Sequence, residues 1–305
     1  MIKSFKVTNY VGDSLELILR EPEKSGFLIK EVTGLGPAKA TINTIDISTK
    51  DGANFNSARM DKRNIVFDIM FVNNEKKESI ETLRQKSYRY FPVKKEITLV
   101  IETDNRLLRT TGYVESNEPD IFSDEEGCKI SIICPDPFFY AVEGKTTTEY
   151  YSLSPLFEFP FSNESLTEPL LEFSKVQIDT GKNVYYSGDD EIGFIIHIYA
   201  SASATNVRIY NMATGETMSI DSSKLVALTG SDIVNGDEII INTMIGNKSI
   251  VLIRDGKTYN ILNCFGRNSD WLVLRPGDNL IGFDADEGTL NLQFRIENDV
   301  IYEGV

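Results

Sequence analysis

The stretch CKISIICPDPFFY, residues 128–140, joins an alternating apolar pattern to a rigid aromatic turn near the middle of the chain. Every second residue from Cys128 to Cys134 is apolar, which is the pattern of a half-buried β-strand. The two prolines that follow, at 135 and 137, fix their own φ and push the residues before them toward extended conformations. The sequence therefore predicts that a strand ends at Cys134 and that the chain is redirected there.

The same period-two alternation recurs along the whole chain. It is found in the ranges Ile65–Phe71, Ile97–Ile101, Phe194–Ile198 and Leu290–Ile296. Each run has the length of a strand, and the dipeptide Asp255-Gly256 between two such runs predicts a tight hairpin. The fold class predicted from these patterns is mainly β.

One segment follows a different period. Ile80, Leu83, Ser87 and Tyr90 are spaced by three and four residues, which is the spacing of one face of a helix. We expect a helix at about 76–90, capped by Asn74 and ended by the proline at 92. Its apolar stripe could bind a partner helix, but packing over one face or mouth of a small β-barrel is the favoured interpretation.

Changes in polarity and proline content along the sequence divide the chain into two expected domains. Residues 1–140 form the first, and 166–305 form a second, all-β domain whose strand spacing suits a sandwich or jelly roll. The segment 141–165 contains prolines at 155 and 160, which do not occur inside central strands. We interpret it as a connector that carries short edge strands.

Charge and cysteine content exclude several classes of protein. The chain has 31 basic and 46 acidic residues, a formal charge of −15, which argues against a surface that grips nucleic-acid phosphates. The three cysteines have neither CxxC nor metal-ligand spacing, so reduced, buried thiols are expected. Without an export signal or a long apolar run, we expect synthesis in a cytoplasm and no association with a membrane.

Residues that could carry chemistry are few. The single histidine, His197, alternates with strand residues and has no nucleophile motif nearby, so a structural role is favoured. Asp284 and Asp286 resemble part of a calcium loop, but the twelfth position is Arg295 instead of glutamate, which excludes an EF-hand and leaves a loose calcium site as the less favoured alternative. The sequence predicts no enzyme, no cofactor and no metal site. Trp271 could hold a sugar ring, although packing against the core is the favoured interpretation.

Several motifs together resemble one protein family. The chain is similar to the distal tail proteins (Dit) of long-tailed phages and prophages that infect Gram-positive-type bacteria, over nearly its whole length. The motifs that carry the resemblance are VTGLGPAKATINTIDIS, DGANFNSARMDKRNIVFDIMFV, LRQKSYRYFPVKKEITLVI, CKISIICPDPFFY, NGDEIIINTMIGNKSIVL, WLVLRPGDNLI and the terminal YEGV. Each motif alone is weak, and their order along the chain makes the resemblance specific.

The resemblance implies an architecture and a role. The first domain would be a split-barrel-like β domain with one helix, and the second a galectin-like β-sandwich. Six copies would form a homohexameric ring at the virion tail tip, assembled in the host cytoplasm. The ring would dock on the tail tube protein and on a tail-associated lysin or fibre protein, with a receptor-binding protein as a further partner in some members.

The charge fits such a ring, and two other functions remain open. Six times −15 is a formal −90, and if a fair share of that charge lined the lumen, DNA passing through would be repelled instead of bound. The alternatives are a carbohydrate-binding adhesin module that uses Trp271, and a hydrolase with an unrecognised carboxylate pair.

The turn after Cys134 is expected to act as an interdomain hinge instead of a catalytic site. Asp136 would bond to nearby backbone, as aspartates in turns do, and the three aromatic residues would pack at the seam between the domains. The expected hinge residues are Pro135, Asp136, Pro137, Phe138, Phe139 and Tyr140.

Overall fold

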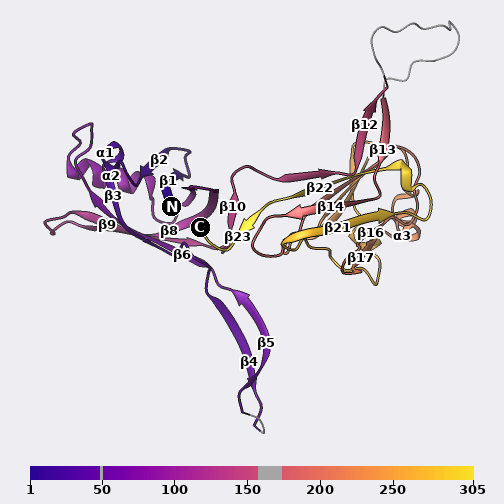
Figure 1. Ribbon diagram of the computed structural model, residues 1–305, viewed down its shortest axis with the longest axis horizontal. Helices are drawn as coiled ribbons and strands as arrows, with labels where there is room; N and C mark the ends of the chain where they lie inside the picture. The colour runs from indigo at the N-terminus through magenta and orange to yellow at the C-terminus, as the bar shows by residue number, and fades with distance from the viewer. Residues whose placement is uncertain (49–50, 157–173) are drawn as a thin grey trace, which may run out of the picture. The chain divides into compact units, whose positions relative to one another are not determined.

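The chain folds as two compact units (Figure 1) in a computed structural model that describes residues 1–48, 51–156 and 174–305. The first unit consists of Met1–Gly144 together with Ile301–Val305, and the second is Lys145–Val300. The last five residues thus return to the first unit, whereas the sequence placed them in the C-terminal domain. Part of the expected connector, 157–165, lies outside the described residues.

The first unit is built on one large antiparallel sheet in the order β2-β1-β7-β8-β9-β6-β3, with β10 paired to β8 and to β23. Its elements are β1 (Ile2–Asn9), β2 (Ser14–Ile18), α1 (Pro22–Ser25), β3 (Phe27–Thr33), β4 (Ala40–Asp46), β5 (Ala53–Met60), β6 (Arg63–Phe71), α2 (Ile80–Tyr90), β7 (Glu96–Thr103), β8 (Leu107–Asp120), β9 (Gly127–Cys134), β10 (Phe139–Ala141) and β23 (Ile301–Tyr302).

This sheet curls onto itself and encloses a core. Phe5 on β1 and Phe67 on β6 are four strands apart in the sheet order, which is roughly 19 Å in a flat sheet at about 4.8 Å per strand. Their ring centroids are nevertheless only 5.2 Å apart. The predicted alternating runs at Ile65–Phe71, Ile97–Ile101 and Cys128–Cys134 supply the core residues, which confirms those strands.

The predicted helix exists but is shorter than expected. It begins at Ile80 instead of residue 76, and its cap is Ser79, whose Oγ accepts a hydrogen bond from the Thr82 amide. The expected cap, Asn74, instead closes a turn by accepting a hydrogen bond from the Glu78 amide at 2.9 Å. Lys77 has a φ of +52°, a left-handed conformation that stops any helix from starting earlier.

The second unit contains a six-stranded sheet, β11-β22-β15-β18-β19-β20, a four-stranded sheet, β14-β21-β16-β17, and the pair β12-β13. Its elements are β11 (Thr146–Glu149), β12 (Tyr151–Pro155), β13 (Ser174–Ile178), β14 (Gly181–Tyr186), β15 (Ile195–Ala200), β16 (Arg208–Asn211), β17 (Thr217–Ser219), α3 (Ser222–Thr229), β18 (Glu238–Asn242), β19 (Ser249–Arg254), β20 (Lys257–Asn260), η1 (Leu262–Cys264), β21 (Gly277–Asp284), η2 (Thr289–Asn291) and β22 (Leu292–Asn298).

The two larger sheets face each other as a β-sandwich. Phe283 of the four-stranded sheet stacks on Phe294 of the six-stranded sheet at 3.7 Å between ring centroids. The predicted hairpin at Asp255-Gly256 is confirmed, because it joins β19 to β20 with both φ angles positive. Leu290 was wrongly included in the last alternating run. It lies in η2 and is 71% exposed, since the turn at Gly288 delays the start of the strand.

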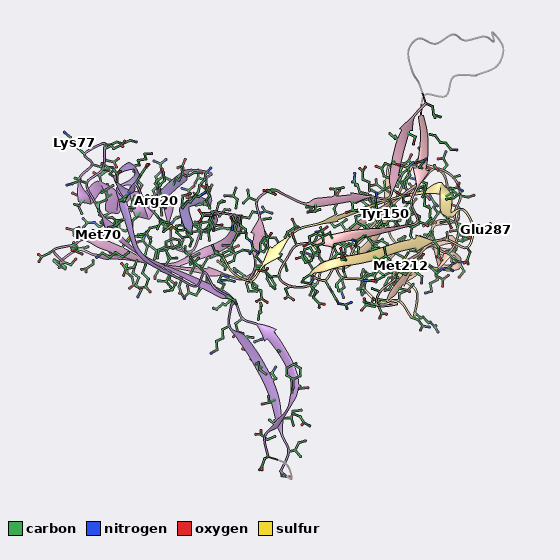
Figure 2. All side chains as sticks on the ribbon, in the orientation of Figure 1. Arg20, Met70, Lys77, Tyr150, Met212 and Glu287 are labelled. Atoms are coloured by element: carbon green, nitrogen blue, oxygen red, sulfur yellow. The ribbon has the colours of Figure 1, made fainter. Side chains whose placement is uncertain are left out.

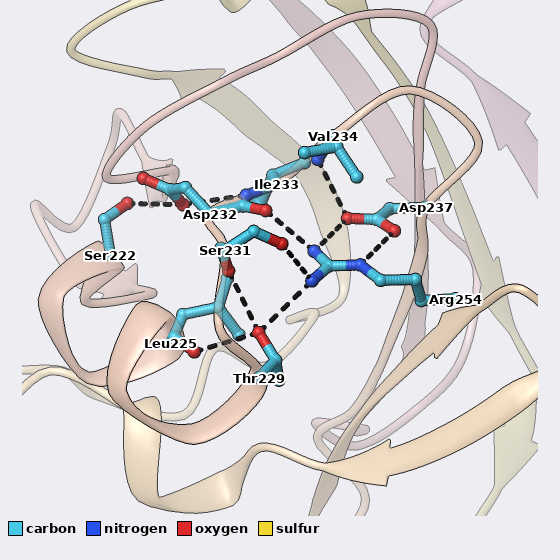
Figure 3. Close-up of polar contacts among 9 residues, drawn as sticks. All are labelled: Ser222, Leu225, Thr229, Ser231, Asp232, Ile233, Val234, Asp237 and Arg254. Atoms are coloured by element: carbon cyan, nitrogen blue, oxygen red, sulfur yellow. Dashed lines mark hydrogen bonds and ion pairs between the residues drawn. The ribbon is translucent and has the colours of Figure 1, made fainter.

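A buried ion pair fastens α3 and its following loop to β19 (Figure 3). The Asp237 carboxylate, 1% exposed, accepts hydrogen bonds from Arg254 Nε at 2.8 Å and Nη2 at 2.5 Å. The same guanidinium donates to Ser231 Oγ at 2.6 Å and to the Asp232 carbonyl at 2.7 Å. Because these groups all bond to the same guanidinium, they fix the conformation of the loop that carries them.

The cysteines are free and buried, as predicted. Burial raises the pKa of the Cys128 thiol to about 12, and it also raises the pKa values of Cys134 and Cys264. Thiols with raised pKa values are weak nucleophiles at neutral pH. No helix among the described residues is long and apolar enough to cross a membrane.

Replacing Arg254 with methionine should lower the free energy of unfolding by about 3–5 kcal/mol, because the Asp237 carboxylate stays buried without its cation. Urea denaturation followed by far-UV circular dichroism measures this. Lys257→Met, which removes an exposed cation from the same hairpin, is the control and should change little. Equal effects of the two substitutions would contradict a structural role for the ion pair.

Candidate functional site

A long hairpin of the first unit does not pack against that unit's core. Strands β4 and β5 form a two-stranded sheet of their own and project from the ends of β3 and β6 (Figure 1). Side chains line both strands with no other element of the first unit beside them (Figure 2). An isolated two-stranded hairpin is marginally stable in water, so a partner that covers it would stabilise it.

The two faces of this hairpin differ in polarity. The register pairs Ile42 with Ala58 and Thr44 with Phe55, after a bulge between Asn43 and Thr44. Paired residues share a face, so one face carries Ala40, Ile42, Thr44, Phe55, Ala58 and Met60. Ile42 is 62% exposed and Phe55 68% exposed. We call this set the apolar hairpin face. Apolar side chains gathered on one exposed face are typical of interaction surfaces.

The root of the hairpin is fixed by Arg63, the first residue of β6. Its Nε donates to the Pro137 carbonyl at 2.7 Å and its Nη2 to the Glu303 carbonyl at 2.6 Å. Its Nη1 donates to the carbonyls of Gly34 at 2.7 Å and Gly36 at 2.5 Å. One side chain therefore ties the glycine loop, the mid-chain turn and the C-terminus together.

The charge of Arg63 is stabilised mainly by carbonyl dipoles, since no carboxylate lies within 4 Å of its guanidinium among the described residues. Its guanidinium lies 4.2 Å from the centroid of the Phe139 ring, a cation–π contact. Burial lowers the pKa of Arg63 from its ordinary value, with smaller opposing contributions from nearby acidic groups. Four carbonyl oxygens replace its water, which satisfies the buried cation only when all three segments are in place.

A glycine makes this arrangement possible. Gly34 has a φ of +84°, and a Cβ at that position would lie 1.9 Å from the carbonyl oxygen of Asn64. Only glycine fits a left-handed residue this close to a neighbouring backbone. The last residue of the chain, Val305, donates its amide to the carbonyl of Leu35 at 3.0 Å, so the C-terminus lies against the same loop.

The expected hinge residues all lie in the first unit. Asp136 Oδ1 accepts a hydrogen bond from the Phe138 amide at 3.1 Å, and its Oδ2 accepts one from the Tyr140 hydroxyl at 2.6 Å. Phe139 is buried in the core and pairs with Tyr302 across β10 and β23. The turn geometry matches the expectation for Asp136, and the hinge role of Pro135, Pro137 and their neighbours stays a prediction.

Trp271 and His197 occupy different places in the second unit. The Trp271 ring stacks on Phe265 at 4.7 Å between centroids, and the Lys248 ammonium lies 5.3 Å from it. His197 projects from the outer face of β15, with Nδ1 3.2 Å from Glu238 Oε1. It lines a shallow groove with Tyr151, Tyr199, Glu238, Gln293 and Arg295.

The aspartates that resembled a calcium loop are engaged by an arginine. Arg208 Nε lies 2.7 Å from Asp284 Oδ1, and its Nη1 lies 2.6 Å from Asp286 Oδ1. A hydrogen bond from Asn206 and the Arg208 pair hold the pKa of Asp286 below its usual range. Within the described residues, no group of three or more acidic, histidine or cysteine side chains is placed to hold a metal.

Comparisons with known proteins agree with this architecture. Residues 22–141 match the model of the phage tail protein RIFT-related domain. This segment is therefore similar to a domain of phage tail proteins. The fold of the whole chain is similar to that of a distal tail protein. The Dit protein of SPP1, described as a paradigm of the hub adsorption apparatus in phages infecting Gram-positive hosts, matches with a TM-score of 0.62 at 12% identity. That match covers 97% of this chain and 99% of the other.

A second solved structure is less similar. A chain of the phage P2 baseplate in its activated conformation with Ca matches with a TM-score of 0.40 and 13% identity, covering 98% of each chain. Among curated proteins, no relative matches the sequence. The galectin-like character of the second unit stays a prediction.

Sequence reasoning missed two features of this protein. Arg63 lies in one of the motifs that carry the family resemblance. The residues whose carbonyls it binds are up to 240 positions away along the chain, so no local pattern indicates its role. The hairpin was missed because its bulge interrupts the alternation. The apolar residues at 42, 45 and 47 are a weak signal that could have indicated two strands there.

Replacing Arg63 with methionine should lower the free energy of unfolding by about 3 kcal/mol or more, because several buried carbonyls lose a charged donor. Arg63→Lys should recover only part, since a compact ammonium cannot reach all four oxygens. Urea denaturation measures the change, and tryptic cleavage at Lys62 reports on the loosened root. Arg59→Met, which removes an exposed cation nearby, should shift stability by no more than about 0.5 kcal/mol. A stable Arg63→Met protein would contradict the anchor.

Proposed function

We propose that this protein is a structural hub of a phage tail tip. Six copies close into a ring that joins the tail tube protein to a tail-associated lysin or fibre protein, and receptor-binding proteins are a further partner. The ring lets DNA pass through its lumen without specific binding. The role is structural and non-catalytic.

The observation that carries this proposal is the apolar hairpin face. Ile42 and Phe55 are too exposed to stabilise the isolated chain, and they lie on a hairpin whose outer edges pair with no other strand among the described residues. Free strand edges and an apolar face are hazards for a monomer, and they become useful when a neighbouring copy covers them. A ring requires this kind of repeated contact between unlike surfaces.

The family match and the fold support the same proposal. The matched domain, 22–141, contains the hairpin and most of the Arg63 anchor. The whole-chain likeness to the SPP1 Dit protein spans both units. The formal charge of −15 per copy is compatible with a lumen that repels DNA.

Light scattering after size exclusion should show a species of about 206 kDa, which is six times 34.3 kDa, at high protein concentration. Ile42→Thr with Phe55→Thr should shift this species toward the monomer, because the covered apolar area is lost. Ile45→Thr is the matched control, since Ile45 is exposed on the opposite face of the same hairpin. Disassembly by the control alone, or by neither variant, would contradict this use of the hairpin.

A second candidate function is saccharide binding by the second unit. The groove beside His197 offers two tyrosine rings together with guanidinium, carboxylate, imidazole and amide groups on one sheet face. Arg295 Nε in this groove is buried and has no hydrogen-bond partner among the residues that the structure describes, so a bound hydroxyl could satisfy it. This groove is a better candidate than Trp271, whose ring is already stacked on Phe265.

A glycan array with the full chain should show a signal that Tyr199→Ala reduces and Trp271→Ala leaves unchanged. Tyr185→Ala, which removes an exposed tyrosine elsewhere in the second unit, controls for nonspecific effects. Loss of the signal only on Trp271→Ala would instead support the site expected from the sequence. No signal from the unmodified chain would contradict this second function.

A further inference from the structure

Two unusual surface features lie at opposite ends of the same strand pair in the first unit. Strands β6 and β9 are paired from Arg63↔Cys134 at one end to Met70↔Gly127 at the other. Seven residue steps, from 63 to 70, span roughly 23 Å at about 3.3 Å per residue. The hairpin root adjoins the Arg63 end. The β8–β9 tip, residues 121–126, adjoins the other end, near the Met70 label in Figure 2.

The tip carries an unprotected aromatic side chain among acids. Phe122 is 99% exposed and follows Ile121, itself exposed. Glu125 and Glu126 form ion pairs with Lys30 and Arg84 of their own unit. Asp120 and Asp124 flank Phe122 and have no cation within 4 Å in the described part of the chain. The tip is therefore an aromatic anchor with two unpaired carboxylates beside it.

The hairpin root carries the complementary chemistry. Lys39, Arg59, Met60, Asp61 and Lys62 line an open hollow of about 590 Å³. The Thr41 hydroxyl donates one bifurcated hydrogen bond to the two carboxylate oxygens of Asp61. Lys39, Arg59 and Lys62 have no carboxylate within 4 Å among the described residues. Three unpaired cations in one place are notable in a chain with a formal charge of −15. Met60 contributes an adaptable apolar wall to the hollow.

We propose that the β8–β9 tip of one copy docks in the hairpin-root hollow of the next copy, with Phe122 against Met60 and the flanking aspartates facing the lysines. The two features cannot meet within one copy, because the paired length of β6 and β9 separates them. A contact between opposite ends of identical molecules is heterologous, and repeated around an axis it closes into a ring. This inference rests on the proposed hexameric hub and names the surfaces that form it.

Cross-linking tests the contact directly. Phe122→Cys combined with Met60→Cys, treated with a short bis-maleimide, should give a ladder of covalent oligomers up to the hexamer on a denaturing gel. The native thiols are buried, so background reaction is low. Each single variant should give dimers at most. Phe122→Cys with Ile45→Cys, on the opposite hairpin face, is the control and should give no ladder.

Charge reversal tests complementarity independently of cross-linking. Asp120→Lys with Asp124→Lys, and separately Lys39→Glu with Lys62→Glu, should each weaken assembly about tenfold or more. A chain with all four reversals should assemble again, which excludes misfolding as the cause of the losses. Assembly of the unmodified chain should also weaken as salt rises.

Two results would overturn the inference, and they differ in what they leave standing. If the unmodified chain forms rings but shows no ladder and no response to the reversals, the hub stands and this contact is wrong. If the unmodified chain stays monomeric at the highest concentration reached, both the proposed ring and this contact are wrong.

Discussion

The first unit depends on one buried guanidinium. Within the described part of the chain, no carboxylate lies within 4 Å of Arg63, so carbonyl groups solvate its charge. These carbonyls come from the glycine loop, the mid-chain turn and the last residues of the chain. Removing any of these segments exposes or orphans the cation. The requirement makes the three segments mutually dependent. It also gives the hairpin a rigid root, so the hairpin can project without a core of its own.

The second unit is inserted between two paired strands of the first unit. The chain leaves the first unit after β10 and returns to it as β23, and these two strands pair with each other. The second unit is therefore an insertion with its own hydrophobic core, centred on the stack of Phe283 and Phe294. Because each unit has its own core, surface residues of the second unit can change without disturbing the proposed assembly surfaces of the first.

The exposed features of the first unit are all of kinds that favour association between protein molecules. Free strand edges, the apolar hairpin face and the solvent-exposed Phe122 would each promote aggregation of an uncharged protein. A formal charge of −15 keeps copies apart at long range. In the proposed contact, the cations of the hairpin-root hollow would favour one orientation of approach over others, because charge gives specificity more than affinity.

The sequence alone determined the strands that bury one face, because alternation at Ile65–Phe71 or Cys128–Cys134 states which residues share a face. It also determined the helix, but not its start, because the left-handed Lys77 follows from a turn closed by Asn74. It could indicate neither the role of Arg63 nor the exposed hairpin. Only the tertiary structure decides whether a shared face meets a core, and only it brings the carbonyl of Glu303 to a side chain 240 residues away.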